Sequence, residues 1–280
     1  MHTQKHAPTI TLPAGYRFDV PQMTDHIAVA DLFNAQSRVH FGRDEHEADD
    51  LKSDWESPNF DLATSAILIR TADDTVVGYS IVWDGYNPPV NVHCRVLLHP
   101  DHEAPELGNA LIAWVEDRAK QAIDRCPPEA RVTFRLGTKV GDDFYETLFT
   151  AHGFSPVRYW WTMRIDRVDD PASPQFPEGI SVRPMRYPDD LPEIIHADRE
   201  PFSDHCGYVE QPFEEELKDW QHWITSDKKF DPNLWFVATD DKTGEIAAIC
   251  LCESSWRNDD TAGHVDTLGV RKAYRKRGLG

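Results

Sequence analysis

The chain has 280 residues, a length that favours two domains of about 100 to 170 residues each. With 40% hydrophobic and 11% aromatic residues it can bury a large core, which excludes a disordered or fibrous protein. Lys and Arg number 29 against 48 Asp and Glu, and the net charge of −19 opposes binding to DNA or to an anionic membrane by the surface as a whole.

The sequence carries no sign of export. It has no run of about 18 apolar residues, and its start lacks the apolar stretch of a signal peptide. We therefore expect a cytoplasmic protein with no membrane partner. The cysteines are odd in number and show no Cys-x-x-Cys spacing, so reduced core thiols are favoured over disulfides or a zinc site. They are Cys94, Cys126, Cys206, Cys250 and Cys252.

Helix and strand patterns alternate through the first half of the chain. Short runs rich in β-branched and aromatic residues predict strands, at residues 16–20, 65–70, 76–83, 92–98, 131–136 and 156–165. Apolar residues three and four positions apart predict helices, at residues 24–33, 48–55, 105–126 and 142–152. Gly153 closes the last of these helices.

The same order of elements restarts after a proline-rich linker at residues 169–179. Strands are predicted at residues 180–184, 234–239, 245–252 and 264–270, and helices near residues 191–195 and after Pro212. Corresponding residues of the two halves are separated by a slowly rising number of positions. The separation is 163 from Pro21 to Pro184, 168 from Trp55 to Trp223, 169 from Gly78 to Ala247, and 172 from Gly108 to Gly280. We interpret the chain as two copies of one α/β unit.

The second copy stops after its fourth strand. A unit that ended there would expose a sheet edge and one apolar sheet face, so we expect the sequence to be a fragment of a longer protein. The alternative is that a partner chain supplies the missing half.

The end of the chain has the features of an anion site. The strand at residues 264–270 runs into a basic segment and then into Arg275-Lys276-Arg277-Gly278-Leu279-Gly280. Backbone N–H groups of such a loop can point at a phosphate, the glycines let it approach closely, and the cations add charge.

A strand followed by Arg-x-x-Gly-x-Gly resembles the acetyl-CoA pyrophosphate loop of the GNAT superfamily of N-acetyltransferases. The order of elements in residues 16–165 is similar to the whole GNAT fold, and both halves together resemble a tandem GNAT arrangement. The resemblance implies an α/β fold with an α+β mixed sheet. It implies a degenerate GNAT-like domain at residues 1–168, and a GNAT domain of catalytic type at residues 180–280 that lacks its last helices and strands.

The resemblance also implies a ligand and its contacts. In GNAT proteins the residues matching Leu268 and Val270 pair through their backbone with the pantetheine arm, and the following loop wraps the pyrophosphate. Acetyl-CoA is thus the expected cosubstrate, and no metal is expected. The expected cofactor-binding residues are Leu268, Gly269, Val270, Arg275, Lys276, Arg277, Gly278, Leu279 and Gly280.

The first copy carries a different loop. Residues 96–108 align without gaps with residues 268–280, which places Glu103 at the position of Arg275 and Glu106 at that of Gly278. Two carboxylates would repel a pyrophosphate, and Pro105 has no N–H to donate. We therefore expect no acetyl-CoA in the first copy. Tyr145 occupies the family's acid position there, but a packing role is favoured.

Candidate catalytic residues come from the strands of the second copy. Asp266 on the fourth strand and Glu253 at the end of the third are the carboxylates nearest the expected cleft, where either could deprotonate an amine. The alternative is a solvated strand-end carboxylate. Asp204 and His205, between the first two helices of this copy, resemble the segment that borders the acceptor site in tandem GNATs, and a solvated loop is the alternative.

Three functions compete. The leading one is an acyl-CoA-dependent N-acyltransferase that moves an acetyl group from acetyl-CoA to a primary amine of a small molecule by direct attack. It is expected to act as a monomer or dimer, to be inactive in the truncated form, and to prefer a cationic amine because the chain is acidic. The second is a non-catalytic, acetyltransferase-like regulatory or interaction module. The third, nucleic-acid binding by the basic cluster at residues 271–277, is opposed by the net charge.

Overall fold

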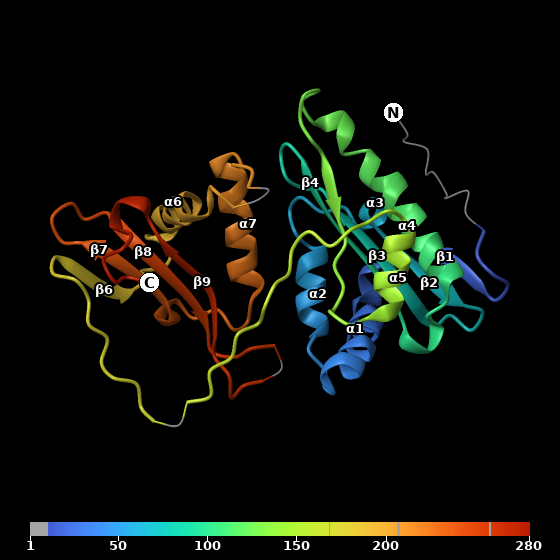
Figure 1. Ribbon diagram of the computed structural model, residues 1–280, viewed down its shortest axis with the longest axis horizontal. Helices are drawn as coiled ribbons and strands as arrows, with labels where there is room; N and C mark the ends of the chain where they lie inside the picture. The colour runs from blue at the N-terminus through green and yellow to red at the C-terminus, as the bar shows by residue number, and fades with distance from the viewer. Residues whose placement is uncertain (1–10, 168, 206–207, 258) are drawn as a thin grey trace. The chain divides into compact units, whose positions relative to one another are not determined.

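The computed structural model describes residues 11–167, 169–205, 208–257 and 259–280, so Cys206 lies outside the described part. The chain divides into two compact units (Figure 1). Unit 1 comprises Met1–His152 with Gln211–Lys228, and unit 2 comprises Gly153–Glu210 with Lys229–Gly280. No helix in these described ranges is long and apolar enough to cross a membrane.

Unit 1 is built on a five-stranded sheet in the order β1-β2-β3-β4-β5. Neighbouring strands are antiparallel except β4 and β5, which run parallel, so the mixed sheet expected from the sequence is confirmed. The strands are β1 (Tyr16–Asp19), β2 (Ala66–Thr71), β3 (Val76–Trp83), β4 (Asn91–Leu98) and β5 (Thr133–Arg135).

Helices of unit 1 bury their apolar stripes against this sheet. Val29 and Leu32 of α1 and Trp55 of α2 form a buried cluster with Tyr79 and Leu97 on one face. Helix α4 packs against β3 and β4 as well. The helices are α1 (His26–Phe41), α2 (Ala48–Trp55), α3 (Leu62–Ser65), α4 (Pro105–Lys120) and α5 (Asp143–Ala151), with 3-10 turns η1 (Met23–Asp25), η2 (Pro100–His102) and η3 (Ile123–Arg125).

Unit 2 is built on an antiparallel sheet in the order β6-β7-β8-β9. The apolar face of α6 packs against β8 and β9, and Ile194 and Ile195 of this helix are fully buried. The elements are β6 (Ile180–Pro184), α6 (Leu191–Phe202), η4 (Pro232–Leu234), β7 (Trp235–Asp240), β8 (Ile246–Glu253), β9 (His264–Val270) and η5 (Lys272–Tyr274).

The internal repeat extends to irregular details. The β2–β3 pairing shifts register after Ile69, and the β7–β8 pairing shifts register after Ala238, which is 169 residues later. The short turns η2 and η5 follow β4 and β9 at the offset of 172 residues that the sequence predicts. Both copies therefore turn out of the fourth strand in the same way, which makes their loops directly comparable.

Helix α7 (Phe213–Ser226) groups with unit 1, although both segments that flank it belong to unit 2. The Ser53 hydroxyl of α2 donates to that of Ser226 over 2.6 Å, and His222 donates from Nε2 to the Ser53 carbonyl over 3.0 Å. Asn59 donates to Asp219 over 3.1 Å. The sequence instead assigned this helix to a domain at residues 180–280, and those domain boundaries stay a prediction.

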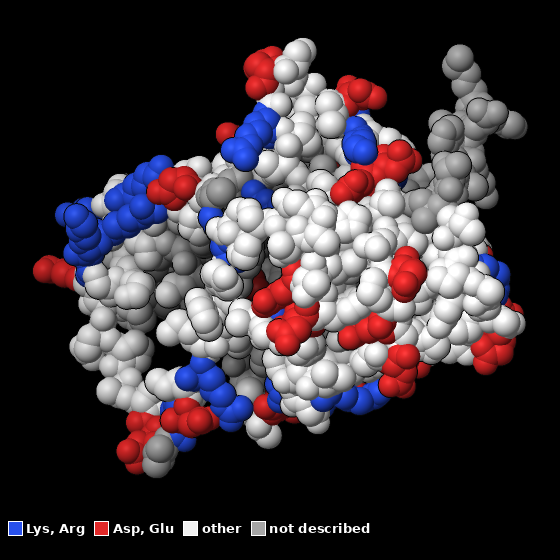
Figure 2. Space-filling model, turned by 45° about the vertical axis from the view of Figure 1, so that its right-hand side comes forward, with Lys and Arg blue, Asp and Glu red and all other residues white. Residues whose placement is uncertain are grey.

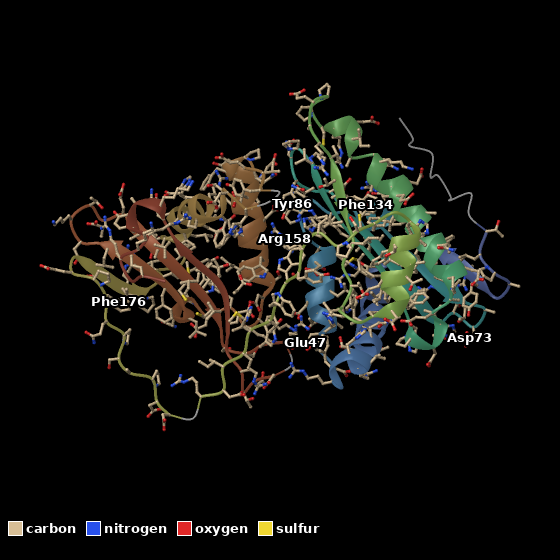
Figure 3. The ribbon with its side chains drawn as sticks, viewed as in Figure 1. Glu47, Asp73, Tyr86, Phe134, Arg158 and Phe176 are labelled. Atoms are coloured by element: carbon tan, nitrogen blue, oxygen red, sulfur yellow. The ribbon has the colours of Figure 1, made fainter. Side chains whose placement is uncertain are left out.

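The strand predicted at residues 156–165 is wrong. Residues 154–167 have no regular secondary structure, and the side chains of Trp160, Trp161 and Met163 are 75%, 77% and 92% exposed. Arg158, labelled in Figure 3, lies with its guanidinium carbon 5.7 Å from the centre of the Trp160 ring. The alternating apolar residues carry β propensity, but a strand also needs a neighbouring edge to pair with, which no local pattern specifies.

The described cysteines are Cys94, Cys126, Cys250 and Cys252, and all are free thiols. The sulfur atoms of Cys250 and Cys252 lie 3.6 Å apart on β8, and burial together with Cys250 raises the pKa of Cys252 to about 12. The Cys252 thiol is therefore protonated at neutral pH. Within the described ranges no group of three or more His, Cys, Asp or Glu side chains is arranged to hold a metal ion.

Candidate functional site

Strand β9 forms one edge of the unit 2 sheet, because β8 is its only partner strand in the described sheet. The amide of Arg271 donates to the Ala247 carbonyl over 3.0 Å, toward β8. Backbone groups of an antiparallel strand alternate in direction, so those of Leu268 and Val270 point away from β8. The edge therefore offers a short ladder of N–H and C=O groups.

The loop after β9 has the conformation of an anion-binding nest. Lys276 and Gly278 have φ angles of 63° and 82°, on either side of Arg277. A left-handed residue other than glycine costs on the order of 1 kcal/mol, so the surroundings hold Lys276 in place. Among the described residues no backbone partner accepts from the amides of residues 276–280. Successive amides left open in this way form a concave donor site.

Side chains of the loop anchor it to the end of α6. Arg275 donates from Nε to the Val270 carbonyl over 3.2 Å and from Nη2 to the Pro201 carbonyl over 3.1 Å. Glu200 accepts from Arg271 Nε over 2.8 Å, and this hydrogen bond holds the pKa of Glu200 below its usual range. Of the predicted loop residues, Arg275 thus contributes a structural side chain, while Lys276 and Arg277 are exposed.

Gly269 lies where α6 crosses β9. A Cβ atom there would come within 3.3 Å of Ile249 and Pro201 and within 3.4 Å of Phe202, so glycine permits the close approach. The predicted acceptor residues Asp204 and His205 follow directly, and the rings of Phe202 and His205 lie 4.9 Å apart. Asp204 and His205 therefore adjoin the loop end of β9.

Asp266 occupies a β-bulge near the other end of β9. The register pairs Leu251 with Thr267 and then Cys252 with Val265, which leaves Asp266 as the extra residue. Its side chain is 52% exposed and accepts from the Thr267 hydroxyl over 3.0 Å. The matching β3–β4 pairing of unit 1 runs without a shift, so the bulge distinguishes the two copies.

His264 joins the two predicted carboxylates, and sequence reasoning missed it. It is the cross-strand partner of Glu253, and its Nε2 lies 3.9 Å from Oδ1 of Asp266. Its ring lies 3.8 Å from that of Trp256. Burial, with a smaller contribution from Arg257, lowers the pKa of His264 against the opposing effect of Asp266. The available signal was a His two residues before Asp266 at the start of a strand, which the 13 histidines of the chain obscure.

In unit 1 the corresponding groups are occupied by the protein itself. The Leu98 amide donates to the Tyr145 hydroxyl over 2.7 Å. Gln36 donates from Nε2 to the Leu98 carbonyl over 2.8 Å and to Glu103 over 2.7 Å. Burial raises the pKa of both Glu103 and Tyr145. The carbonyl accepts from a side chain in both units, so the difference lies at the amide, which Tyr145 occupies at Leu98 and which has no partner at Val270 among the described residues.

Comparison with known proteins agrees with this geometry. Residues 191–280 match the Acetyltransferase (GNAT) family. The chain is 26% identical over 237 residues to mycothiol acetyltransferase of Segniliparus rotundus, covering 83% of this chain and 80% of the relative. A GCN5-related N-acetyltransferase structure from Sphaerobacter thermophilus superposes with a TM-score of 0.76 at 28% identity, covering 96% of this chain and 80% of that one.

A tandem GNAT protein from the clavulanic acid biosynthesis pathway shares the fold, with a TM-score of 0.57 at 15% identity over 95% of this chain and 82% of that chain. Residues 191–280 therefore carry the sequence of a GNAT acetyltransferase domain. The chain that carries this domain is a homologue of mycothiol acetyltransferase and has tandem GNAT proteins among its structural neighbours.

Proposed function

We propose that this protein moves an acetyl group from acetyl-CoA to a primary amine of a small molecule, with the chemistry in unit 2. The observation that carries the proposal is the contrast between the two copies. Among the described residues the Val270 amide and the amides of residues 276–280 have no partner, whereas Tyr145 accepts from the matching Leu98 amide of β4; the carbonyls of Val270 and Leu98 both accept from side chains.

Acetyl-CoA fits the open groups in two places. The amides of residues 276–280, with the side chains of Lys276 and Arg277, would hold the pyrophosphate as a nest. The outward backbone groups of Leu268 and Val270 would pair with the amides of the pantetheine arm, as an added strand does. Gly269 contributes the close packing of α6 that holds this strand. Acetyl-CoA supplies the activated thioester.

The length of the pantetheine arm then selects the reacting end of the site. About 13 chain atoms separate the phosphate from the thioester sulfur, which equals about four extended residues or roughly 14 Å. Four residues back along β9 from Val270 is the bulged Asp266. The thioester would therefore lie at the end of the strand where Asp266, His264 and Glu253 gather.

This end has the groups that amine acetylation needs. An acceptor ammonium must lose a proton before its nitrogen attacks the thioester carbon. We assign this step to the His264, Asp266 and Glu253 group, and the lowered pKa of His264 keeps its imidazole neutral and able to accept a proton at pH 7. The Asp266 carboxylate would attract the ammonium. Asp204 and His205 adjoin the loop end of β9 instead, so this step gives them no part.

The acceptor class rests on two supports. The acidic chain attracts a cationic amine, and the similarity to mycothiol acetyltransferase favours a small-molecule acceptor. Acidic side chains are scattered over the face seen in Figure 2, where basic side chains gather in a few clusters. A cytoplasmic location belongs to the same proposal.

Calorimetric titration of acetyl-CoA into the full chain tests the cofactor site. Arg277→Glu should weaken binding by about tenfold or more, because it places a carboxylate beside the pyrophosphate. The matched control is Lys242→Glu, the same charge change at an exposed turn of unit 2. Equal weakening by both variants, or by neither, would contradict the site. Binding without acetyl transfer to any amine of a broad panel would favour the non-catalytic module.

A further inference from the structure

Unit 1 carries different side chains, one of them cationic, at the strand positions that match the proposed acceptor site. In unit 1 Trp83 is the cross-strand partner of His93. The pair at the same position in unit 2 is Glu253 with His264. Two positions further along the sheet, Ile81 pairs with Arg95 in unit 1, and Leu251 pairs with Thr267 at the same position of unit 2. Asp266 has no counterpart, because β4 lacks the bulge. Unit 1 therefore has an aromatic ring where unit 2 has Glu253 and a guanidinium where unit 2 has Thr267.

The guanidinium of Arg95 is held by an aromatic platform. Its central carbon lies 4.9 Å from the centre of the Phe33 ring, a cation–π distance. Phe33 in turn packs on His46 at 4.9 Å and on Tyr79 at 5.9 Å between ring centres. Tyr79 is fully buried and accepts from the Trp55 indole over 3.0 Å. The platform is thus part of the rigid core rather than a mobile loop.

Arg95 differs from the structural arginines of the same unit. Arg70 donates to Asp19 over 2.8 Å and to Asp25 over 2.6 Å, and Arg118 donates to Asp84 over 2.7 Å. Among the described residues Arg95 has neither an ion pair nor a hydrogen bond. Its side chain keeps access to solvent, but the surrounding protein lowers the pKa of its guanidinium by burial, against the opposing effects of Tyr79 and Asp54. A guanidinium offers five N–H donors in a fixed fork. At Arg95 this fork has no carboxylate to bind.

The titratable groups around Arg95 are a histidine, a second cation and a carboxylate. Burial and the charges of Arg95 and Lys139 lower the pKa of His46 to about 4. Burial and Arg95 likewise lower the pKa of Lys139. The neighbouring carboxylate is Asp54, and burial with the charge of Asp50 raises its pKa to about 6. These groups influence one another without forming an ion pair to Arg95, in a chain that otherwise carries a net charge of −19.

We propose that this face of unit 1 is a second binding site, which takes a small molecule bearing an oxyanion. The Arg95 fork would bind two oxygens of a carboxylate or phosphate, and Lys139 would supply a further cation. The partly buried Phe33 ring would support the ligand's apolar part. This site is independent of the proposed acetyl transfer, because none of its residues belongs to unit 2.

The test is a titration of the full chain with inorganic phosphate and, separately, with phenyl phosphate. The melting temperature is measured at each concentration, at constant ionic strength, and chloride serves as the control anion. We expect a saturable stabilisation by phosphate, stronger for phenyl phosphate, and absent with chloride. Acetate and benzoate in place of the phosphates distinguish a carboxylate site from a phosphate site. Arg95→Gln should weaken the response by about tenfold or more, and Arg95→Lys should weaken it less.

The matched control is Arg131→Gln, which removes an exposed arginine of unit 1 that has no hydrogen bond or ion pair among the described residues. It should respond like the parent chain. No saturable response to either anion class in the parent chain, or equal losses in the Arg95 and Arg131 variants, would overturn the proposal. If Arg95→Gln does not fold, as judged by circular dichroism, Lys139→Gln replaces it and should weaken the same response.

Discussion

The Leu98 amide of β4 donates a hydrogen bond to the Tyr145 hydroxyl of α5 over 2.7 Å, in a buried position. This bond occupies the strand amide whose counterpart in unit 2, that of Val270, has no partner among the described residues. Tyr145→Phe should therefore leave a buried amide unpaired and lower the free energy of unfolding by about 1 to 3 kcal/mol. Urea denaturation measures the loss.

The same variant separates two roles of Tyr145. Since Glu103 still opposes a pyrophosphate, Tyr145→Phe should not create acetyl-CoA binding in unit 1, and the stoichiometry of binding should stay unchanged. A gain of a second acetyl-CoA per chain in this variant would show that Tyr145 alone closes the site. Phe144→Leu is the control for packing, because it changes the neighbouring aromatic residue and removes no hydroxyl.

The His264 and Asp266 pair predicts a pH dependence of acetyl transfer. Because only neutral imidazole accepts a proton, the rate should rise with pH through a pKa below the ordinary value near 6.5. Asp266 raises the pKa of His264, so Asp266→Asn should move this limb to lower pH. His264→Asn should reduce kcat by about 100-fold or more, since general base catalysis contributes at least that factor.

Acetyl-CoA affinity serves as the control for these variants. It should stay unchanged in His264→Asn, because the pyrophosphate loop lies at the other end of β9. An unchanged pH profile in both variants would exclude His264 as the base and return the role to Glu253. Glu253→Gln then becomes the variant to compare.

The environment of Asp190 leads us to expect that the stability of unit 2 falls at acid pH. Burial raises its pKa, but hydrogen bonds from Arg183 and Arg186 outweigh burial and hold the pKa well below the usual range. A carboxyl whose folded pKa is depressed stabilises the fold above its unfolded pKa, near 3.9, and loses that contribution as the pH falls below it. Stability of the parent chain should therefore fall steeply below about pH 4.

Asp190→Asn tests this expectation. It removes the carboxylate that both arginines bind, and because both arginines are partly exposed the free energy of unfolding at pH 7 should drop by about 1 to 2 kcal/mol. The decline below about pH 4 should become shallower. Asp189→Asn, the exposed neighbour, should leave both quantities unchanged. A similar acid limb in the parent and Asp190→Asn chains would rule out Asp190 as its source.

Local patterns predicted most strands and helices, because each depends on the spacing of apolar residues along one segment. They also predicted the loop at residues 275–280, since glycines and cations after a strand are a local signal. The bulge at Asp266 was not predictable, because a register shift is a relation between two strands. His264 was missed for the same reason, as its partner Glu253 is defined by pairing. The helix that begins at Phe213 was predicted from its apolar spacing. That spacing shows that one face is buried, but it does not determine which unit the face packs against.

Helix α7 gives the last prediction. The hydroxyl oxygens of Ser53 and Ser226 lie 2.6 Å apart, so cysteines at both positions have Cβ atoms close enough for a disulfide. Ser53→Cys with Ser226→Cys should oxidise in air and run faster on a non-reducing gel, and dithiothreitol should reverse the change. Each single variant controls for bonding to the native cysteines. Failure of the double variant to cross-link under mild oxidant would mean that α7 does not stay on α2 in solution.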